Sequence, residues 1–273
     1  MQKMEYKNHY LSFVVGIVVV LCLMYSLRSC TSKGDNGTAT GDFSDTINVA
    51  IEYSPVSFYR YNDTIGGFNY DMAQSIAREH GLRLKFQPIV NLIQSLKALE
   101  DNKIDLLIAD LPITAEKKGQ HSFLEPSYMD RHVLVQLRDS LSSDSLTMSQ
   151  LELANDTVWI VEGSFVKERI DNLGEEIGDT IYTHTVAASG SQELFMLVAD
   201  GKVKQAVIPE NVAKALMKEY PQVKIATDIS FPQFQSWMIS DKHPALCDSL
   251  NKWISEFKET ERYQDLLRRY GIE

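Results

Sequence analysis

The sequence predicts an α/β protein of two lobes, preceded by an N-terminal hydrophobic anchor. Three observations support this prediction. Short apolar segments alternate with amphipathic ones along most of the chain, which is the pattern of strand–helix–strand units. This alternation stops at a Ser- and Asp-rich stretch over residues 139–149 and then restarts. An uncharged apolar segment lies near the N-terminus and is followed by a polar one.

The N-terminal segment has the pattern of an export signal or a membrane anchor. Lys3 and Lys7 precede an uncharged run from Tyr10 to Leu27, the order of a positive n-region and an apolar h-region. The run is long for a cleaved signal peptide and just long enough to cross a bilayer. We therefore predict a signal peptide or transmembrane anchor over residues 1–29.

The residues after this run resemble the recognition sequence of bacterial lipoproteins. Leu27 lies three residues before Cys30 and the small Ser29 lies directly before it, whereas Arg28 departs from the usual pattern. Two interpretations stay open: lipidation of Cys30 after cleavage, or retention of a single transmembrane helix. Residues 30–45 are rich in Ser, Thr, Gly and Asp, so we predict a flexible tether. Both interpretations place the body outside the cytoplasm, on a membrane.

The first round of alternation predicts a lobe that begins at residue 46. Apolar residues at helical spacing, such as Met72 and Ile76, predict a helix that Gly81 ends. Leu92, Leu96 and Leu99 mark one face of a second helix. The elements expected here are strands at 46–53, 82–88, 104–109 and 132–137, and helices at 69–80 and 92–99.

The second round predicts another lobe of the same kind, followed by two terminal helices. We expect strands at 157–161, 180–185, 205–208, 223–226 and 235–240, and helices at 165–173, 191–200, 210–219, 245–258 and 262–270. Helices between strands predict parallel sheets covered on both faces. The terminal helices need a surface to pack on, so we assign residues 46–134 and 229–273 to lobe 1 and residues 135–228 to lobe 2.

Charge and cysteine usage exclude several classes of function. The formal net charge is −10, whereas a nucleic-acid partner needs a basic surface. Of the three cysteines, Cys22, Cys30 and Cys247, only the last belongs to the predicted globular part. An internal disulfide and a zinc site of cysteines are therefore excluded there. We predict no cofactor, no metal ligand and no catalytic residue.

The predicted strand ends indicate where a ligand binds. In open α/β sheets, ligands bind outside the carboxyl ends of the strands. Those ends are Tyr53 to Phe58, Asp110 to Lys117, Gly163-Ser164 and Pro209-Glu210. If the two lobes face each other, these four loops line one cleft.

Several motifs in the predicted order resemble one known family. They are INVAIEYSPVSFY, Gly67 to Met72, Lys103-Ile104-Asp105, Ile113 to Lys117, Phe123 to Tyr128, Glu162-Gly163-Ser164 and Val198 to Lys202. Over residues 46–273 the chain resembles the bacterial extracellular solute-binding proteins of family 3, which bind polar amino acids. The segment from Ser236 to Tyr270 is most similar to the binding domain of membrane-bound lytic murein transglycosylase F. The resemblance implies a periplasmic-binding-protein type 2 clamp that closes on a small ligand.

The resemblance also implies charged ligand-binding residues. Lys117 aligns with the arginine that holds the ligand carboxylate in the family, but lysine offers a point charge in place of a planar fork; it is otherwise a solvated lysine. Glu210 lies beside Pro209, near which the family has an amine-binding aspartate; it also suits the first turn of a helix. Asp110 supplies the missing negative charge, or else it only fixes the turn before Pro112.

Uncharged candidates complete the predicted site. Tyr53 and Phe58 follow the first strand, where aromatic rings pack against the apolar part of a ligand, or else belong to the core. Thr114 and Ser164 precede helices, so each is either an N-cap, a hydrogen-bond donor to the ligand, or both.

Together these features predict a membrane-anchored, extracytoplasmic solute-binding protein rather than an enzyme. It captures a small amino-acid-like or peptide-like ligand between its lobes and serves an ABC permease or a cell-wall component. The catalytic domain of the transglycosylase would follow residue 270, so lytic activity is not expected. Two alternatives stay open: a non-catalytic regulator that binds muropeptides, and an enzyme that resembles cyclohexadienyl dehydratase.

Overall fold

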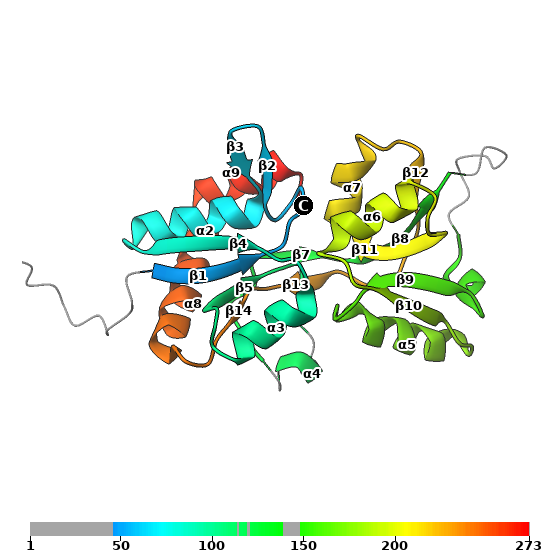
Figure 1. Ribbon diagram of the computed structural model, residues 1–273, viewed down its shortest axis with the longest axis horizontal. Helices are drawn as coiled ribbons and strands as arrows, with labels where there is room; N and C mark the ends of the chain where they lie inside the picture. Colours follow the sequence, from blue (N-terminus) through cyan, green and yellow to red (C-terminus); the bar gives the residue numbers. More distant parts are fainter. Residues whose placement is uncertain (1–45, 114, 119–120, 139–147, 273) are drawn as a thin grey trace, which may run out of the picture. The chain divides into compact units, whose positions relative to one another are not determined.

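The computed structural model describes residues 46–113, 115–118, 121–138 and 148–272 (Figure 1). The predicted anchor and tether, with Cys30, lie outside these residues, and so does Thr114. Within the described part, no helix has both the length and the apolar character needed to cross a membrane.

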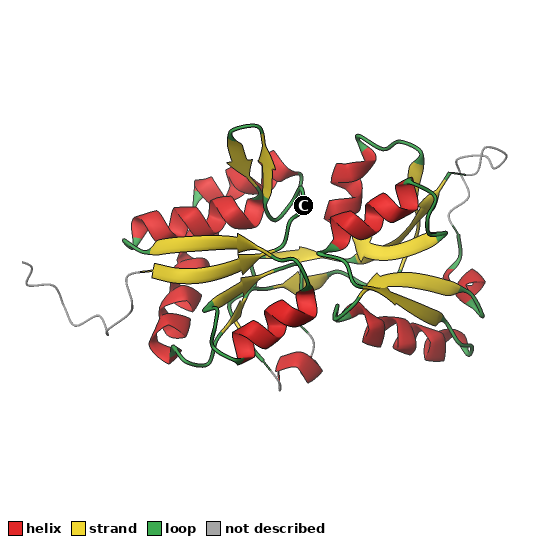
Figure 2. Ribbon diagram, viewed as in Figure 1, coloured by secondary structure: helices red, strands yellow, loops and turns green. Residues whose placement is uncertain are grey.

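The first lobe is built on a mixed five-stranded sheet (Figure 2). Its strand order is β4 (Arg83–Pro88), β1 (Thr46–Ile51), β5 (Leu106–Ile108), β14 (Met238–Ile239) and β6 (Ser122–Phe123). β1 runs parallel to β4 and β5, whereas β14 runs antiparallel to both of its neighbours. Of the two six-residue strands in this sheet, β1 is more deeply buried than β4, because sheet neighbours flank it on both sides.

The second lobe repeats this arrangement. Its sheet has the order β10 (Tyr182–Val186), β9 (Thr157–Val161), β11 (Gln205–Pro209), β8 (His132–Leu137) and β12 (Val223–Asp228). β9 runs parallel to β10 and β11, and β8 runs antiparallel to β11 and β12. The lobe boundary predicted between residues 134 and 135 falls inside β8, which pairs only with strands of this second sheet.

The expectation of purely parallel sheets was wrong in both lobes. A short ribbon of β7 (Tyr128–Asp130) and β13 (Gln233–Gln235), paired antiparallel, connects the lobes (Figure 1). β8 follows one ribbon strand and β14 follows the other. Each therefore starts where the other strands of its sheet end, and the chain has to run in the opposite direction.

Helices cover both faces of each sheet. In the first lobe α2 (Phe68–Glu79) packs with α8 (Pro244–Lys258) and α9 (Glu261–Tyr270), and α3 (Leu92–Glu100) contacts β5. In the second lobe α6 (Ser191–Ala199) and α7 (Glu210–Met217) lie on one side of the sheet and α5 (Val166–Ile177) lies on the other (Figure 1). The remaining short helices are α4 (Ala115–Lys118) and the 3-10 helix η1 (Gln150–Leu153).

A small hairpin in the first lobe did not follow from the sequence pattern. It consists of β2 (Tyr59–Tyr61) and β3 (Thr64–Gly66), paired antiparallel. Strands of three residues are too short to show an alternating pattern. The turn residue Asn62 has a φ of 53°, a conformation that asparagine tolerates better than most residues.

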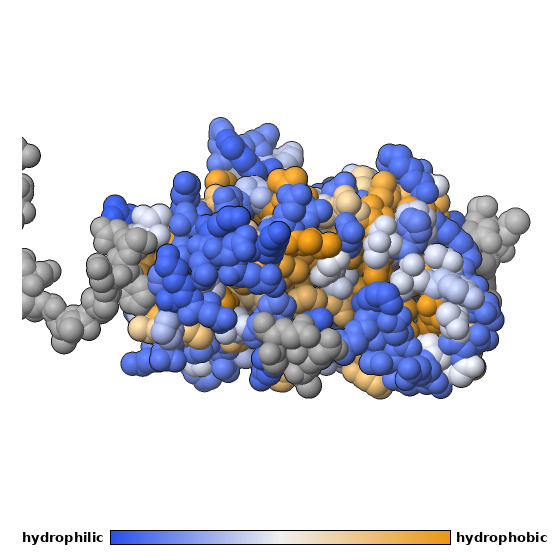
Figure 3. All heavy atoms as spheres, turned by 60° about the horizontal axis from the view of Figure 1, so that its bottom comes forward, coloured by the Kyte–Doolittle hydropathy of each residue, from blue (hydrophilic) through white to orange (hydrophobic). Residues whose placement is uncertain are grey.

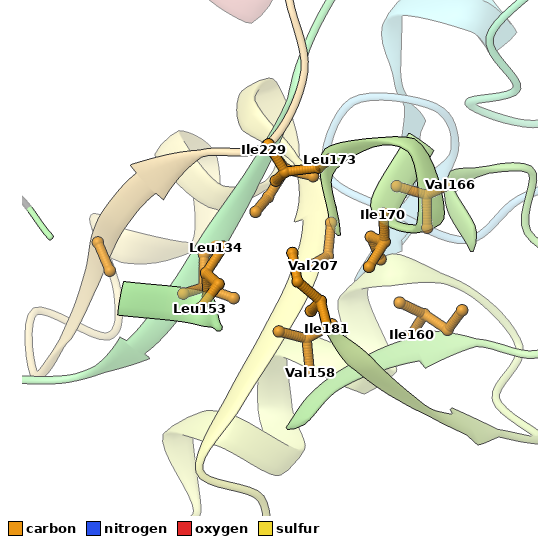
Figure 4. Close-up of a cluster of buried hydrophobic side chains, with 11 residues drawn as sticks. Leu134, Leu153, Val158, Ile160, Val166, Ile170, Leu173, Ile181, Val207 and Ile229 are labelled. Atoms are coloured by element: carbon orange, nitrogen blue, oxygen red, sulfur yellow. The ribbon is translucent and has the colours of Figure 1, made fainter. Parts of the chain in front are cut away.

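Each lobe has its own hydrophobic core. In the second lobe, side chains from β9, β11 and α5 point toward one another (Figure 4). Burying one such aliphatic side chain contributes about 1.5–3 kcal/mol. The core of the first lobe includes Leu92, Leu107 and Met238, and it also takes in Phe165, which follows β9 of the second lobe. On the face shown in Figure 3, hydrophobic residues gather toward the middle and hydrophilic ones cover the outer parts.

Candidate functional site

The carboxyl ends of the strands meet at a small cavity between the lobes, here called the inner cavity. Its volume is about 30 Å³. Glu52 and Asp110 line it from the first lobe, and Ser164, Pro209 and the loop Ser189–Ser191 line it from the second. A volume of this size holds about two water molecules. A larger solute can therefore enter only if the lobes move apart.

Glu52 connects the two lobes directly. It follows β1, and only 6% of it is exposed. Its Oε1 accepts the backbone N–H of Ser191 at 3.0 Å, and its Oε2 accepts the N–H of Asp110 at 3.1 Å. Ser191 begins α6, which has no side-chain cap of its own. A carboxylate at this position satisfies an otherwise unpaired N–H group and complements the helix dipole.

Gly190 makes this contact between the lobes possible. A Cβ atom at this position would lie 2.6 Å from Oε1 of Glu52, which is inside the van der Waals distance. Any larger residue would therefore push the carboxylate away from the first turn of α6.

Asp110 is the second buried acid of the cavity. Its Oδ1 accepts the hydroxyl hydrogen of Tyr128, whereas its Oδ2 is buried without a hydrogen-bond partner in the described structure. Burial raises the pKa of Asp110 well above its usual value, and the negative charge of Glu52 raises it further. Burial also raises the pKa of Glu52, against the lowering effect of the N–H groups of Ser191 and Asp110. The two carboxyls together therefore favour retention of a proton.

Ser164 faces the same cavity from the second lobe. It follows β9, and its Oγ is also buried without a hydrogen-bond partner among the described residues. An unsatisfied buried polar atom costs about 1–3 kcal/mol. A ligand that pairs with Asp110 Oδ2 and Ser164 Oγ recovers part of that cost in each lobe.

Two further buried ionisable residues belong to this region: His132 lines the inner cavity, and Asp130 precedes it by two positions. Burial lowers the pKa of His132 to about 4, so this imidazole is neutral at pH 7. Burial raises the pKa of Asp130 to about 7, although Asp130 accepts the N–H groups of Arg131 and Asn211. At pH 7 neither His132 nor any other described residue of the inner-cavity lining therefore supplies a positive charge to balance an ionised acid.

The structure brings Asp110 and Ser164 together at the inner cavity, but not the other described candidates. Phe58 is buried in the first lobe, where its ring makes edge contacts with Tyr53 and Tyr70. Glu210 is paired with Arg131 at 3.0 Å and with Lys214 at 3.1 Å, away from this cavity.

Tyr53 and Lys117 also lie apart from the lining of the inner cavity. Tyr53 lines a neighbouring groove. Nζ of Lys117, on α4, lies 5.2 Å from the centre of the Phe165 ring, a geometry typical of a cation–π contact. The lining of the inner cavity therefore contains neither lysine nor arginine among the described residues.

Sequence reasoning missed Glu52 and Ser191. Glu52 had a recognisable signal, because it is an acid at the end of an apolar strand, directly before the selected Tyr53. Ser191 had none, because its role is played by a backbone N–H at a helix start. Within the described residues, no group of three or more His, Cys, Asp or Glu side chains is arranged to hold a metal ion.

The two lobes, the connecting ribbon and the cavity at the strand ends define a clamp of the periplasmic-binding-protein type. The family follows from comparison with known proteins. Residues 46–273 match the family model of the bacterial extracellular solute-binding proteins, family 3. The chain belongs to this family, which confirms the predicted resemblance and implies an extracytoplasmic location.

Curated relatives of two kinds are similar to this chain. The arginine-binding extracellular protein ArtP of Bacillus subtilis is 23% identical over 93% of this chain and 96% of its own length. The probable histidine-binding protein of Campylobacter jejuni is 23% identical over 98% of this chain and 99% of its own. The membrane-bound lytic murein transglycosylase F of Aeromonas hydrophila is 25% identical over 91% of this chain. This chain spans only 48% of that transglycosylase.

A solved structure shows the same fold. An ancestral arginine-binding protein bound to glutamine superposes with a TM-score of 0.70 at 23% identity, covering 84% of this chain and 98% of its own. This similarity confirms the predicted two-lobed α/β clamp.

Proposed function

We propose that this protein captures a small amino-acid-like or peptide-like solute between its two lobes, and that the solute carries a cationic group. One observation carries this proposal. Asp110 Oδ2 and Ser164 Oγ are buried without hydrogen-bond partners in the described structure, and the two residues line the same cavity from opposite lobes. An ammonium or guanidinium group donates several hydrogen bonds. It also supplies the positive counter-charge for Glu52 and Asp110 that the lining of the inner cavity does not provide.

Capture follows from the position of these atoms. A ligand that contacts both lobes favours the conformation in which the lobes are close. The ribbon of β7 and β13 connects the lobes and is the natural hinge. The role of the protein in this proposal is binding without catalysis, in keeping with the named function of ArtP and of the histidine-binding relative.

Titration calorimetry and X-ray scattering test the proposal together. Arginine, lysine, histidine and glutamine form the first panel, with a purified muropeptide as a further probe. We expect a cationic member to bind and to reduce the radius of gyration. Tight binding with no compaction contradicts the clamp, and tight binding of the muropeptide alone favours the cell-wall regulator.

Attachment to the membrane and delivery to a permease complete the proposal. The apolar run before Cys30 supports an anchored protein that presents its solute to an ABC permease. Lipid labelling of the full chain tests the form of the anchor. If Cys30 is lipidated, Cys30→Ala removes the label. If the unmodified chain stays in the membrane without a label, the segment is a transmembrane helix.

A further inference from the structure

A second and larger depression, here called the outer groove, lies beside the inner cavity. Its volume is about 440 Å³. Strand β2 and the end of α9 line it from the first lobe, and parts of α6 and α7 with the residues after α7 line it from the second. Tyr53, Tyr59, Tyr61 and Tyr270 all contribute to this lining.

The outer groove adjoins the inner cavity at one residue of each lobe. Tyr53 of the groove directly follows Glu52, and Gln192 of the groove directly follows Ser191. Consecutive Cα atoms are about 3.8 Å apart. The hydrogen bond from Ser191 to Glu52 therefore lies at the boundary between the two compartments.

Local contacts hold two aromatic rings of the groove, those of Tyr270 and Tyr59, in place. The hydroxyl of Tyr270 accepts the N–H of Gly67 at 2.9 Å and donates to Asp71 at 2.7 Å. A Cβ atom at Gly66 would lie 2.7 Å from the Tyr59 hydroxyl, so this glycine lets the Tyr59 ring lie against the hairpin. Rings fixed in this way bind a ligand at a low cost in conformational entropy.

The two compartments have opposite charge. The inner cavity is lined by Glu52 and Asp110. The outer groove is lined by three cations, Arg60, Lys218 and Arg269, and by one acid, Glu219. Arg269 is paired with Asp71 at 3.3 Å, whereas Arg60 and Lys218 are exposed on opposite lobes.

In a free amino acid the α-ammonium and the α-carboxylate are bonded to the same carbon, so among free amino acids only those with a cationic side chain, such as arginine and lysine, carry a positive charge farther from the carboxylate. In a tripeptide the two charges lie up to about 10 Å apart. We propose that the ligand is a short peptide, with its N-terminal ammonium in the inner cavity and its C-terminal carboxylate at the cations of the outer groove. This inference rests on the function proposed above and specifies the class of solute. The tyrosines contact the body of the peptide.

Matched probes and variants test the peptide. Calorimetry compares each standard amino acid X with the tripeptide X-Ala-Ala and with its C-terminal amide. For the best X we expect the tripeptide to bind about tenfold more tightly than X or more. The double variant Arg60→Ala/Lys218→Ala should weaken tripeptide binding by about 3- to 30-fold and leave binding of X unchanged. Amide formation should have the same effect.

Control variants separate this effect from a change in net charge or in fold. Lys202→Ala/Lys252→Ala also removes two exposed positive charges, but both lie outside the lining of the outer groove, and this variant should leave tripeptide binding unchanged. If X binds as tightly as X-Ala-Ala, or if both double variants behave alike, the proposal of a peptide ligand is contradicted. The proposed capture of a solute between the lobes is not affected by that result. If neither X nor X-Ala-Ala binds, the proposed function fails with it. Asp110→Asn should weaken both kinds of probe.

Discussion

The two lobes share one topology and differ in the chemistry at their strand ends. In each sheet three parallel strands lie side by side, and the next strand in the spatial order is antiparallel to them. That antiparallel strand directly follows a strand of the connecting ribbon. At the cavity the first lobe presents the carboxyl groups of Glu52 and Asp110. The second lobe presents the hydroxyl of Ser164 and the N–H of Ser191, with Pro209 contributing no donor. Topology therefore fixes where the strand ends meet, and local sequence fixes what each lobe offers there.

This difference implies a division of work between the lobes. Charged contacts are worth about 1.5–3 kcal/mol and neutral hydrogen bonds about 0.5–1.5 kcal/mol. Most of the ligand's electrostatic attraction should therefore come from the first lobe. The second lobe should mainly add the contacts that make closure favourable.

The largest expected effect is on the pH dependence of the free energy of unfolding, through the buried carboxyl of Asp130. Asp130 has a pKa of about 7 in the folded protein against 3.8 ordinarily, so the folded state retains a proton that the unfolded chain releases. The stability that this proton provides is present in full below about pH 4 and is lost as pH rises through 7. The loss amounts to about 4 kcal/mol.

Asp130→Asn removes this loss. The stability of the variant relative to the wild type, measured by urea unfolding, should increase from pH 4 to pH 8. His132, with its pKa lowered to about 4, has the opposite slope, but it is present in both proteins and cancels. A constant difference across this range would mean that folding does not raise the pKa of Asp130.

Asp110→Asn tests the charge supplied by the first lobe. The amide keeps the shape of the side chain but not its charge, so the fold should persist. Affinity for a cationic ligand should fall by about 1.5–3 kcal/mol, or roughly ten- to a hundredfold. Titration calorimetry measures this, with the exposed Asp101→Asn as a control on the same lobe. An unchanged affinity would remove the charged contact from the proposal.

Ser164→Ala tests the contribution of the second lobe. The change removes a hydroxyl that has no partner in the described structure, so unfolding should be little affected. Ligand affinity should fall by about 0.5–1.5 kcal/mol. If this loss exceeds that of Asp110→Asn, the assignment of charge to one lobe and neutral contacts to the other is reversed.

Lys117→Ala should have the smallest effect. Its ammonium lies over the Phe165 ring and outside the lining of the inner cavity, so affinity should change by less than about 0.5 kcal/mol. A tenfold loss, with Lys118→Ala as the unaffected control, would instead restore the predicted role of Lys117 in holding a carboxylate.

Local patterns made most of the secondary structure predictable. β8 and β9 have the predicted bounds, because each is a short run of apolar residues between polar ones. Helices α3 and α9 begin directly after Asn91 and Thr260, whose side chains cap them. The β2–β3 hairpin was not predicted, because strands of three residues are too short to show an alternating pattern. The antiparallel direction of β8 and β14 was not predicted either, because it depends on the lobe from which the chain enters each sheet.

The sequence by itself determined the two α/β lobes and the strand ends at which Asp110 and Ser164 stand, because hydrophobic periodicity and strand ends are local properties. Only the tertiary structure decided which of those ends share a cavity. Glu52 and Ser191 are 139 positions apart in the chain, and their contact depends on the approach of the lobes and on the missing side chain of Gly190. The burial that shifts the pKa of Asp110 likewise exists only once the lobes enclose it, since desolvation is a property of the surroundings.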